Sequence, residues 1–125
     1  MSKYKQQNLT GTFENSYRGI RLVLKSERNI RIHFCVAVLV TIAAILLDFD
    51  IVEFCILFLT IGMVIIAESI NSAIEFSLDA VFKNKYSKMV GMAKDISAGA
   101  VMLATMLSIT IGALLFGHAI LDAIF

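Results

Sequence analysis

Proline and tryptophan are absent from the 125 residues of this chain, and glycine occurs only seven times. Without proline, the residue that breaks helices most strongly is missing, which favours long uninterrupted helices. The two cysteines, Cys35 and Cys55, lie in apolar runs without CxxC spacing or nearby histidine ligands. They therefore indicate neither a zinc site nor a disulfide framework. The net charge of +1 gives no support for nucleic-acid binding through overall charge.

What the chain has in excess is apolar side chains, which make up 58% of its residues. A soluble domain averages about 45–50% apolar residues. A small single core cannot hide this much apolar surface, so we expect lipid to be the solvent for much of the chain. The length predicts one domain spanning residues 1–125.

Three long apolar runs predict three transmembrane helices. The first expected helix spans 31–48, with Arg31 and His33 snorkelling at one end and Asp48 ending it. The second spans 51–82 and extends into the cytoplasm. The third spans 94–121, where no Asp, Glu, Lys or Arg occurs from 96 onward, and it is long enough to cross a bilayer with some tilt.

An amphipathic helix is expected ahead of these runs, over about 13–30. Phe13, Tyr17, Ile20 and Leu24 recur at helical spacing, and basic residues occupy much of the remaining surface. This pattern is typical of a helix that lies in the membrane interface. An ordinary surface helix packed on its own protein is the alternative. The expected fold is therefore an all-α integral membrane protein.

All eleven Lys and Arg residues lie before the first run or between the second and the third. The connection between the first two runs and the C-terminal end carry none. By the positive-inside rule, we expect the N-terminus and the second connection to be cytoplasmic and the C-terminus to lie outside. The predicted location is the cytoplasmic membrane.

The second long run ends in a stripe of polar side chains: Glu68, Asn71, Glu75 and Asp79. Their spacings of 3, 4 and 4 place them on one face of a helix. If the helix starts near Ile51, Glu68 lies about 26 Å along it, at the inner edge of the bilayer. Glu75 and Asp79 would then project into the cytoplasm. Acidic groups at this depth are costly unless they meet a cation, so the stripe indicates a functional site.

Phosphoryl transfer from ATP is one chemistry that such residues could carry out. Glu27 and Glu75 could hold Mg²⁺, Lys94 could contact phosphate, and Glu68 could act as a base. No phosphate-binding loop or soluble-kinase motif occurs in the chain. A small ion- or proton-coupled transporter or channel subunit using Glu68 is an alternative. A scaffold that assembles with partner helices is a third possibility.

Three motifs narrow this choice. They are E-x-x-N-S-A-I-E-x-x-x-D at 68–79, G-x-A-K-D at 91–95, and E-R-N-x-R-x-H at 27–33. With them the chain closely resembles the prokaryotic diacylglycerol kinase family of three-helix membrane lipid kinases, over about 13–116. The resemblance implies a homotrimeric helical bundle with active sites between subunits. It also implies MgATP-dependent phosphorylation of a lipid alcohol at the cytoplasmic interface.

Carried over residue by residue, the resemblance implies Glu68 as the catalytic base and Glu27 with Glu75 as the magnesium ligands. Lys94 and Asp95 would bind the nucleotide. Asn71 would support the site. The full nucleotide-binding set expected on this basis is Glu27, Asn71, Glu75, Asp79, Lys94 and Asp95.

Two departures from the family pattern concern the adenine side of the nucleotide. Asn15 stands where some members have a tyrosine that touches the nucleotide, and Tyr17 follows two residues later. The connection at 83–90 contains Tyr86 where other members differ in sequence and length. These three residues are further nucleotide candidates. The E-R-N-x-R-x-H string resembles the branch that phosphorylates undecaprenol more than the branch specific for diacylglycerol, so undecaprenol is the favoured substrate.

Overall fold

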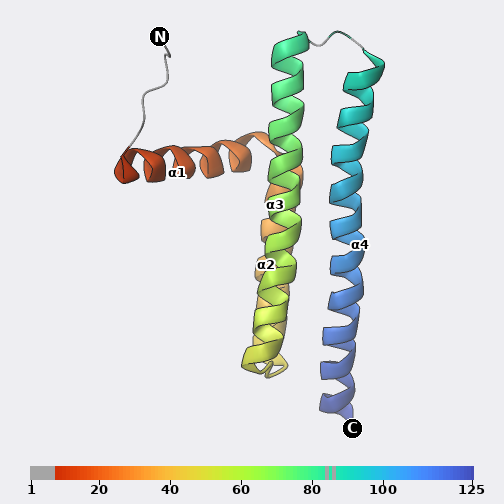
Figure 1. The fold of residues 1–125 in the computed structure, drawn as a ribbon. Coiled ribbons are helices and arrows are strands. Elements are labelled where there is room, and N and C mark those ends of the chain that lie inside the picture. The colour runs from red at the N-terminus through yellow and green to blue at the C-terminus, as the bar shows by residue number, and fades with distance from the viewer. Residues whose placement is uncertain (1–7, 84, 86) are drawn as a thin grey trace.

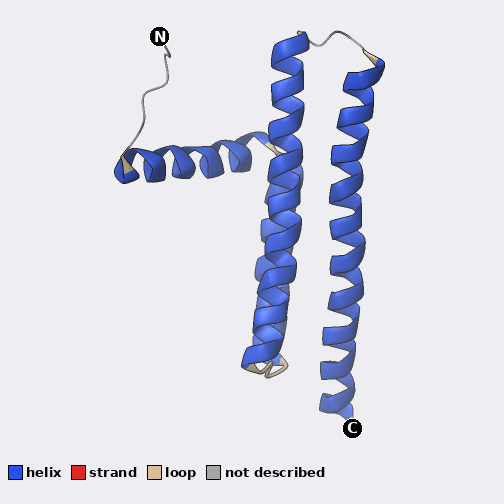
Figure 2. Ribbon diagram, in the orientation of Figure 1, coloured by secondary structure: helices blue, strands red, loops and turns tan. Residues whose placement is uncertain are grey.

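The computed structural model describes residues 8–83, 85 and 87–125. Its regular secondary structure within these residues is entirely helical (Figure 2). The helices are α1 (Leu9–Ser26), α2 (Arg28–Leu46), α3 (Ile51–Phe82) and α4 (Lys88–Ile124). α2 and α4 both pack on α3, and α1 extends crosswise from this bundle (Figure 1).

The three bundle helices are long and apolar enough to cross a membrane. α2 has 19 residues, α3 has 32 and α4 has 37. At 1.5 Å per residue, α3 is about 48 Å long and α4 about 55 Å, compared with a hydrocarbon core of about 30 Å. Both helices therefore extend well beyond the hydrocarbon core, and their extensions are where polar residues can meet water.

Five hydroxyl groups inside the apolar helices are satisfied by their own backbone. Each donates a hydrogen bond to the carbonyl oxygen four residues earlier, at distances between 2.7 and 3.0 Å. The residues concerned are Thr41, Thr60, Ser69, Thr105 and Thr110. This pairing lets a hydroxyl lie at membrane depth without an unsatisfied polar group.

The turn between α2 and α3 fixes the antiparallel packing of these two helices. Asp48 adopts a left-handed conformation, with φ of 55°. Asp50 and Glu53 form a capping box, in which each side chain accepts a hydrogen bond from the other residue's backbone N–H. Phe49 is buried beside the turn, with its ring centroid 5.0 Å from that of Phe116 on α4. A buried cluster of Ala44, Phe49, Leu57 and Ala119 thus holds the three bundle helices together at this end.

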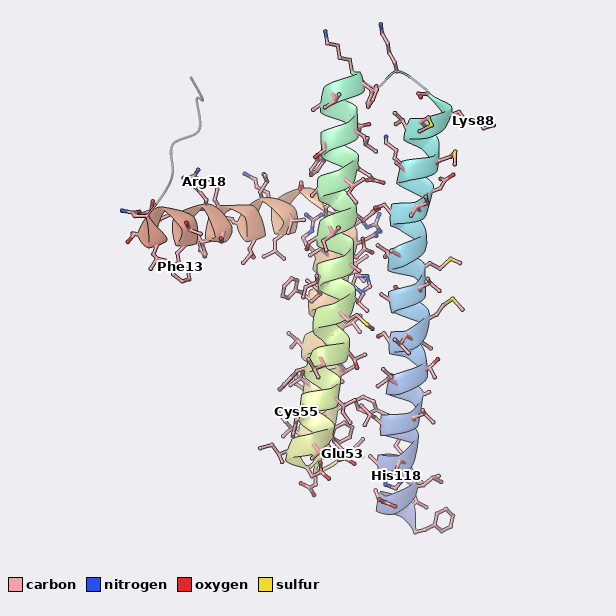
Figure 3. The ribbon with its side chains drawn as sticks, viewed as in Figure 1. Phe13, Arg18, Glu53, Cys55, Lys88 and His118 are labelled. Carbon is pink, nitrogen blue, oxygen red and sulfur yellow. The ribbon has the colours of Figure 1, made fainter. Side chains whose placement is uncertain are left out.

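The helix α1 begins at Leu9, earlier than the expected start at residue 13. Asn8 explains the difference, because its side-chain oxygen accepts a 2.8 Å hydrogen bond from the backbone N–H of Gly11 and caps the helix. Phe13 and Arg18 project from opposite faces of α1 (Figure 3).

A break at Glu27 separates α1 from α2 although neither Gly nor Pro is present there. Glu27 adopts an extended conformation and serves as both the C-cap of α1 and the N-cap of α2. Arg31 stabilises the break: its Nη1 donates to the carbonyl oxygens of Leu24 at 3.1 Å and Lys25 at 2.8 Å. These carbonyls lie in the last turn of α1, where acceptors lack intrahelical partners and a cation is favoured. Arg31 therefore does not simply snorkel, as the sequence suggested, but ties the two helices together.

We expect Arg31→Met to loosen this break. Loss of the guanidinium removes two hydrogen bonds at an exposed helix end, so the backbone amides of residues 24–28 should exchange with solvent about tenfold faster. Hydrogen exchange of the protein in lipid nanodiscs measures this change. Arg28→Met, which removes an exposed arginine on the same turn, is the matched control. Equal exchange in both variants would show that Arg31 does not hold the break.

Candidate functional site

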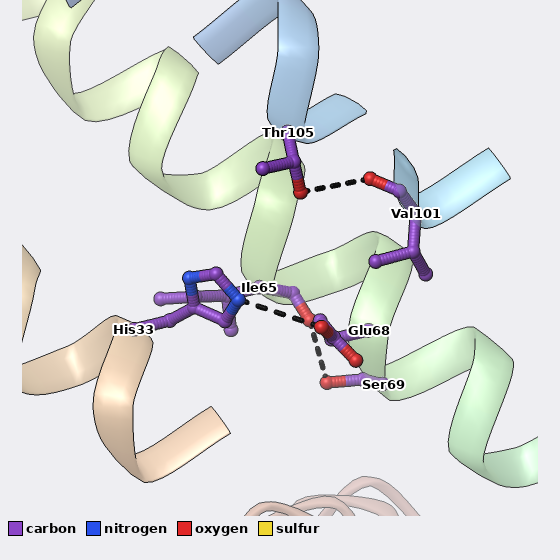
Figure 4. Close-up of polar contacts among 6 residues, drawn as sticks. All are labelled: His33, Ile65, Glu68, Ser69, Val101 and Thr105. Atoms are coloured by element: carbon purple, nitrogen blue, oxygen red, sulfur yellow. Dashed lines mark hydrogen bonds and ion pairs between the residues drawn. The ribbon is translucent and has the colours of Figure 1, made fainter. Parts of the chain in front are cut away.

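The polar stripe predicted on the second long helix lies on α3, and its first member is buried. Glu68 is only 8% exposed in the single chain. Its Oε1 lies 3.4 Å from Nε2 of His33 on α2, an ion pair when the imidazole is protonated (Figure 4). From sequence, His33 was interpreted as a snorkelling or hydrogen-bonded residue at a helix end. In the structure it contacts Glu68.

One turn further along α3, Asn71 joins the helix to α4. The hydroxyl of Ser97 donates to the Asn71 side-chain oxygen at 2.5 Å. Ser97 is buried, and Ser72 beside Asn71 is buried as well. With its carbonyl oxygen accepting this bond, the Asn71 amide NH₂ is directed elsewhere and can donate to another group.

A second polar link between α3 and α4 lies closer to their connection. Lys94 Nζ donates to Asp79 Oδ1 at 2.6 Å, and both side chains are a little more than one-third exposed. The two residues also line a pocket of about 300 Å³, together with Leu78, Phe82, Lys85, Ser87, Val90, Gly91 and Asp95. Two lysines and two aspartates therefore face one small cavity at the end of the bundle where we expect the cytoplasm. Such a cavity offers positive groups to a phosphate and carboxylates to ribose hydroxyls or a metal.

The two expected metal ligands come from different elements. Glu27 lies at the break between α1 and α2, and Glu75 lies on α3, seven residues beyond Glu68. Both are partly buried. Within the described residues there is no cluster of three or more His, Cys, Asp or Glu side chains placed to hold a metal. Mg²⁺ in phosphoryl-transfer sites is often held by one or two carboxylates plus phosphate oxygens, so carboxylates are the type of ligand that such an ion takes.

Two of the further nucleotide candidates, Asn15 and Tyr17, do not line this cavity. Asn15 and Tyr17 lie on α1 and are exposed. Tyr86 lies outside the described residues, so the structure gives no position for its side chain.

Apolar grooves lie beside the polar stripe. One groove of about 430 Å³ is lined by side chains of α2, α3 and α4, from Ile32 and His33 to Phe116. Another, of about 300 Å³, lies between α1 and α3 and includes Ser69, Ser72 and Phe76. No residue of the stripe itself lines either groove, but the first is lined by His33, which contacts Glu68.

Three contacts at this site were missed by sequence reasoning: those made by Arg31, His33 and Ser97. Arg31 and His33 belong to the E-R-N-x-R-x-H motif. The motif therefore identified both residues but did not predict their contacts. Ser97 follows Lys94 by three residues and so shares its helix face. The three-residue spacing from Lys94 to Ser97 was the signal in the sequence that Ser97 could contact the polar stripe of α3.

Comparison with known proteins yields consistent matches. A family model described as prokaryotic diacylglycerol kinase matches residues 14–116. An undecaprenol kinase of Bacillus subtilis is 36% identical over 105 residues, covering 84% of this chain and 85% of that protein. A diacylglycerol kinase of Escherichia coli is 32% identical over 104 residues, covering 82% of this chain and 84% of that protein.

A diacylglycerol kinase of Synechocystis is 34% identical over 105 residues. The match covers 84% of this chain but only 60% of that longer protein. These relatives match over 104 or 105 residues of this chain, and the family model over 14–116 covers α2, α3 and most of α4.

Proposed function

Because the chain belongs to the prokaryotic diacylglycerol kinase family, we propose that it transfers the γ-phosphoryl group of ATP to the hydroxyl of a membrane lipid alcohol. The observation that carries this proposal is the polar stripe of α3. The stripe begins with a buried carboxylate beside apolar grooves and ends at a charged cavity. A lipid kinase must bring a membrane alcohol and a water-soluble nucleotide together, and the two ends of the stripe suit these two partners.

In the proposed reaction Glu68 is the general base. The lipid hydroxyl oxygen attacks the γ-phosphorus, its proton passes to a Glu68 carboxylate oxygen, the bond from γ-phosphorus to the bridging oxygen breaks, and ADP leaves. Lys94 contacts the phosphates after exchanging its Asp79 partner for them. Asn71 offers its NH₂ group to a phosphate or hydroxyl oxygen. Asp79 and Asp95 complete the nucleotide site.

Glu27 and Glu75 are proposed to hold Mg²⁺ with the nucleotide. The ion would neutralise charge on the phosphate oxygens. The contribution of the chain is the placement of two carboxylates from separate elements, one of them fixed by the break that Arg31 stabilises.

Undecaprenol is the favoured acceptor, and diacylglycerol is the alternative. The likeness of the 27–33 motif to the undecaprenol branch supports this preference, as does the 36% identity to a protein named undecaprenol kinase. The groove that runs from His33 to Phe116 gives a hydrocarbon chain a place to lie with its hydroxyl near Glu68.

The setting we propose is the cytoplasmic membrane of a bacterium, with the chain as a single lipid-kinase domain that forms homotrimers with active sites between subunits. The N-terminus and the α3–α4 connection would be cytoplasmic, and the C-terminus would lie outside. α1 would lie in the membrane interface, with Phe13 toward lipid and Arg18 toward phosphate head groups. The distribution of Lys and Arg supports this orientation.

The test is a paired lipid assay on the full chain in nanodiscs. With Mg²⁺ and γ-labelled ATP, we expect label to enter undecaprenol faster than diacylglycerol when each is present at the same surface concentration. Faster labelling of diacylglycerol would reverse the substrate assignment and keep the reaction. No labelled lipid above background with either alcohol would refute the proposed function.

A further inference from the structure

The contact between α2 and α3 at the proposed base involves a side chain to which the reaction above gives no role. His33 Nε2 lies 3.4 Å from Glu68 Oε1, and the two side chains are 27% and 11% exposed. We propose that His33 is a positioning residue, which holds the Glu68 carboxylate by one oxygen and directs the other toward the lipid hydroxyl. This inference rests on the proposed function, because it assigns His33 a role only through Glu68.

The surroundings of Glu68 leave His33 as its partner. The hydroxyls of Ser69 and Thr105, drawn with the pair, donate instead to the carbonyl oxygens of Ile65 and Val101 on their own helices (Figure 4). Within the described residues, His33 makes the only polar side-chain contact to the Glu68 carboxylate. A glutamate side chain has several rotatable bonds, so a partner on a neighbouring helix restricts which conformers it adopts.

Helix packing alone does not explain the contact. α2 and α3 are already held by their tight turn and by the buried cluster around Phe49, at the opposite end of the bundle. The chain contains a natural comparison, because its other histidine, His118, lies 3.3 Å from Asp122 on the same helix. That pair is about two-thirds exposed, near the C-terminal end of α4. A histidine–carboxylate contact therefore occurs once at the polar stripe, between His33 and Glu68, and once far from it, between His118 and Asp122.

A fixed carboxylate matters because proton transfer depends on short, aligned contacts. A base displaced by about 1 Å can cost on the order of 100-fold in rate. With Oε1 held by His33, Oε2 is the oxygen that would receive the hydroxyl proton. The effect of His33 should therefore fall on kcat and leave the binding of ATP at the cytoplasmic cavity unchanged.

The first test compares His33→Leu with His118→Leu in nanodiscs, measuring kcat and the KM for ATP with saturating lipid. We expect His33→Leu to lower kcat about 10- to 100-fold with the KM for ATP within about twofold of wild type. His118→Leu should leave both constants unchanged. His33→Gln, which keeps an N–H donor, should recover a measurable part of the lost kcat. An unchanged kcat in His33→Leu, or a raised KM for ATP in both His33 variants, would overturn the inference.

The second test is a double-mutant cycle with Glu68→Asp, whose shorter side chain keeps a carboxylate but withdraws it from His33. If His33 acts through Glu68, adding His33→Leu to Glu68→Asp should lower kcat less than about threefold further. Fully multiplicative effects would show that His33 acts independently of Glu68, which overturns the positioning role. Activity retained in Glu68→Gln would instead refute the proposed base. An inactive Glu68→Gln with a fully active His33→Leu would refute the positioning role alone.

Discussion

Glu68→Gln should lower kcat by about 1,000-fold while leaving ATP affinity within about twofold of wild type. Glutamine has nearly the same shape as glutamate and is expected to fit the same buried site. It cannot accept a proton at neutral pH, so the lipid hydroxyl would lose its general base. Single-turnover transfer of labelled phosphate measures kcat, and binding of a fluorescent ATP analogue measures affinity.

Glu53→Gln is the matched control for this substitution. Glu53 is a partly buried glutamate on the same helix, but it lies at the other end and serves the capping box with Asp50. Glutamine is also accepted at that position of a capping box, so activity should remain near that of wild type. If Glu68→Gln is as active as Glu53→Gln, Glu68 is not the base.

The second large effect is expected at the ion pair between Lys94 and Asp79. Lys94→Met should lower kcat/KM for ATP about 100- to 1,000-fold, the range found when one preorganised donor to developing charge is removed. The physical reason is that Lys94 would be the cation closest to the phosphates. Steady-state kinetics over a range of ATP concentrations measures the loss. Lys88→Met, at the exposed start of α4, should change kcat/KM less than about threefold.

A charge swap separates the two roles that this pair can have. If Lys94 and Asp79 serve only to join α3 and α4, the double variant Asp79→Lys with Lys94→Asp restores the ion pair and should restore activity. If Lys94 binds phosphate, the swap restores thermal stability but leaves activity as low as in Lys94→Met. We expect the second result. Activity recovered by the swap would remove Lys94 from the nucleotide site.

The three long helices and the stripe on α3 were predictable because each depends on local pattern alone. Apolar runs without proline indicate membrane-spanning helices by length and composition. The spacings from Glu68 to Asp79 place the four polar residues on one face whatever the rest of the chain does. These features can be predicted without knowing how the helices pack. The structure has a helix at each of the three apolar runs, and the four polar residues lie on the second of these helices, α3.

The pairings across helices could not be predicted in this way. His33 with Glu68, Ser97 with Asn71 and Lys94 with Asp79 each depend on the relative height of two helices. That register is set by turn geometry at Asp48 and by packing around Phe49, neither of which a helical period reveals. Helical pattern could identify the residues of the site but not their partners.

The break at Glu27 shows a different limit. The helical pattern runs through this residue without a glycine or proline, so no strong local signal marks the end of α1. The break is stabilised by the guanidinium of Arg31, which reaches back across it to carbonyls six and seven residues earlier. A long side chain from the following helix reaches those exposed carbonyls, whereas sequence reasoning expected that side chain to snorkel at a helix end.

The most direct measurement of the central claim is binding of Mn²⁺, as a paramagnetic substitute for Mg²⁺, to the full chain in nanodiscs with a non-hydrolysable ATP analogue. We expect electron paramagnetic resonance to show nucleotide-dependent Mn²⁺ binding in the wild type. Glu27→Gln and Glu75→Gln should each weaken it at least about tenfold, since even outer-shell partners of a metal have effects of that size. Asp48→Asn, at the opposite end of the bundle, should bind as wild type does. Wild-type Mn²⁺ binding in both glutamate variants would contradict the claim that these carboxylates hold the metal for phosphoryl transfer.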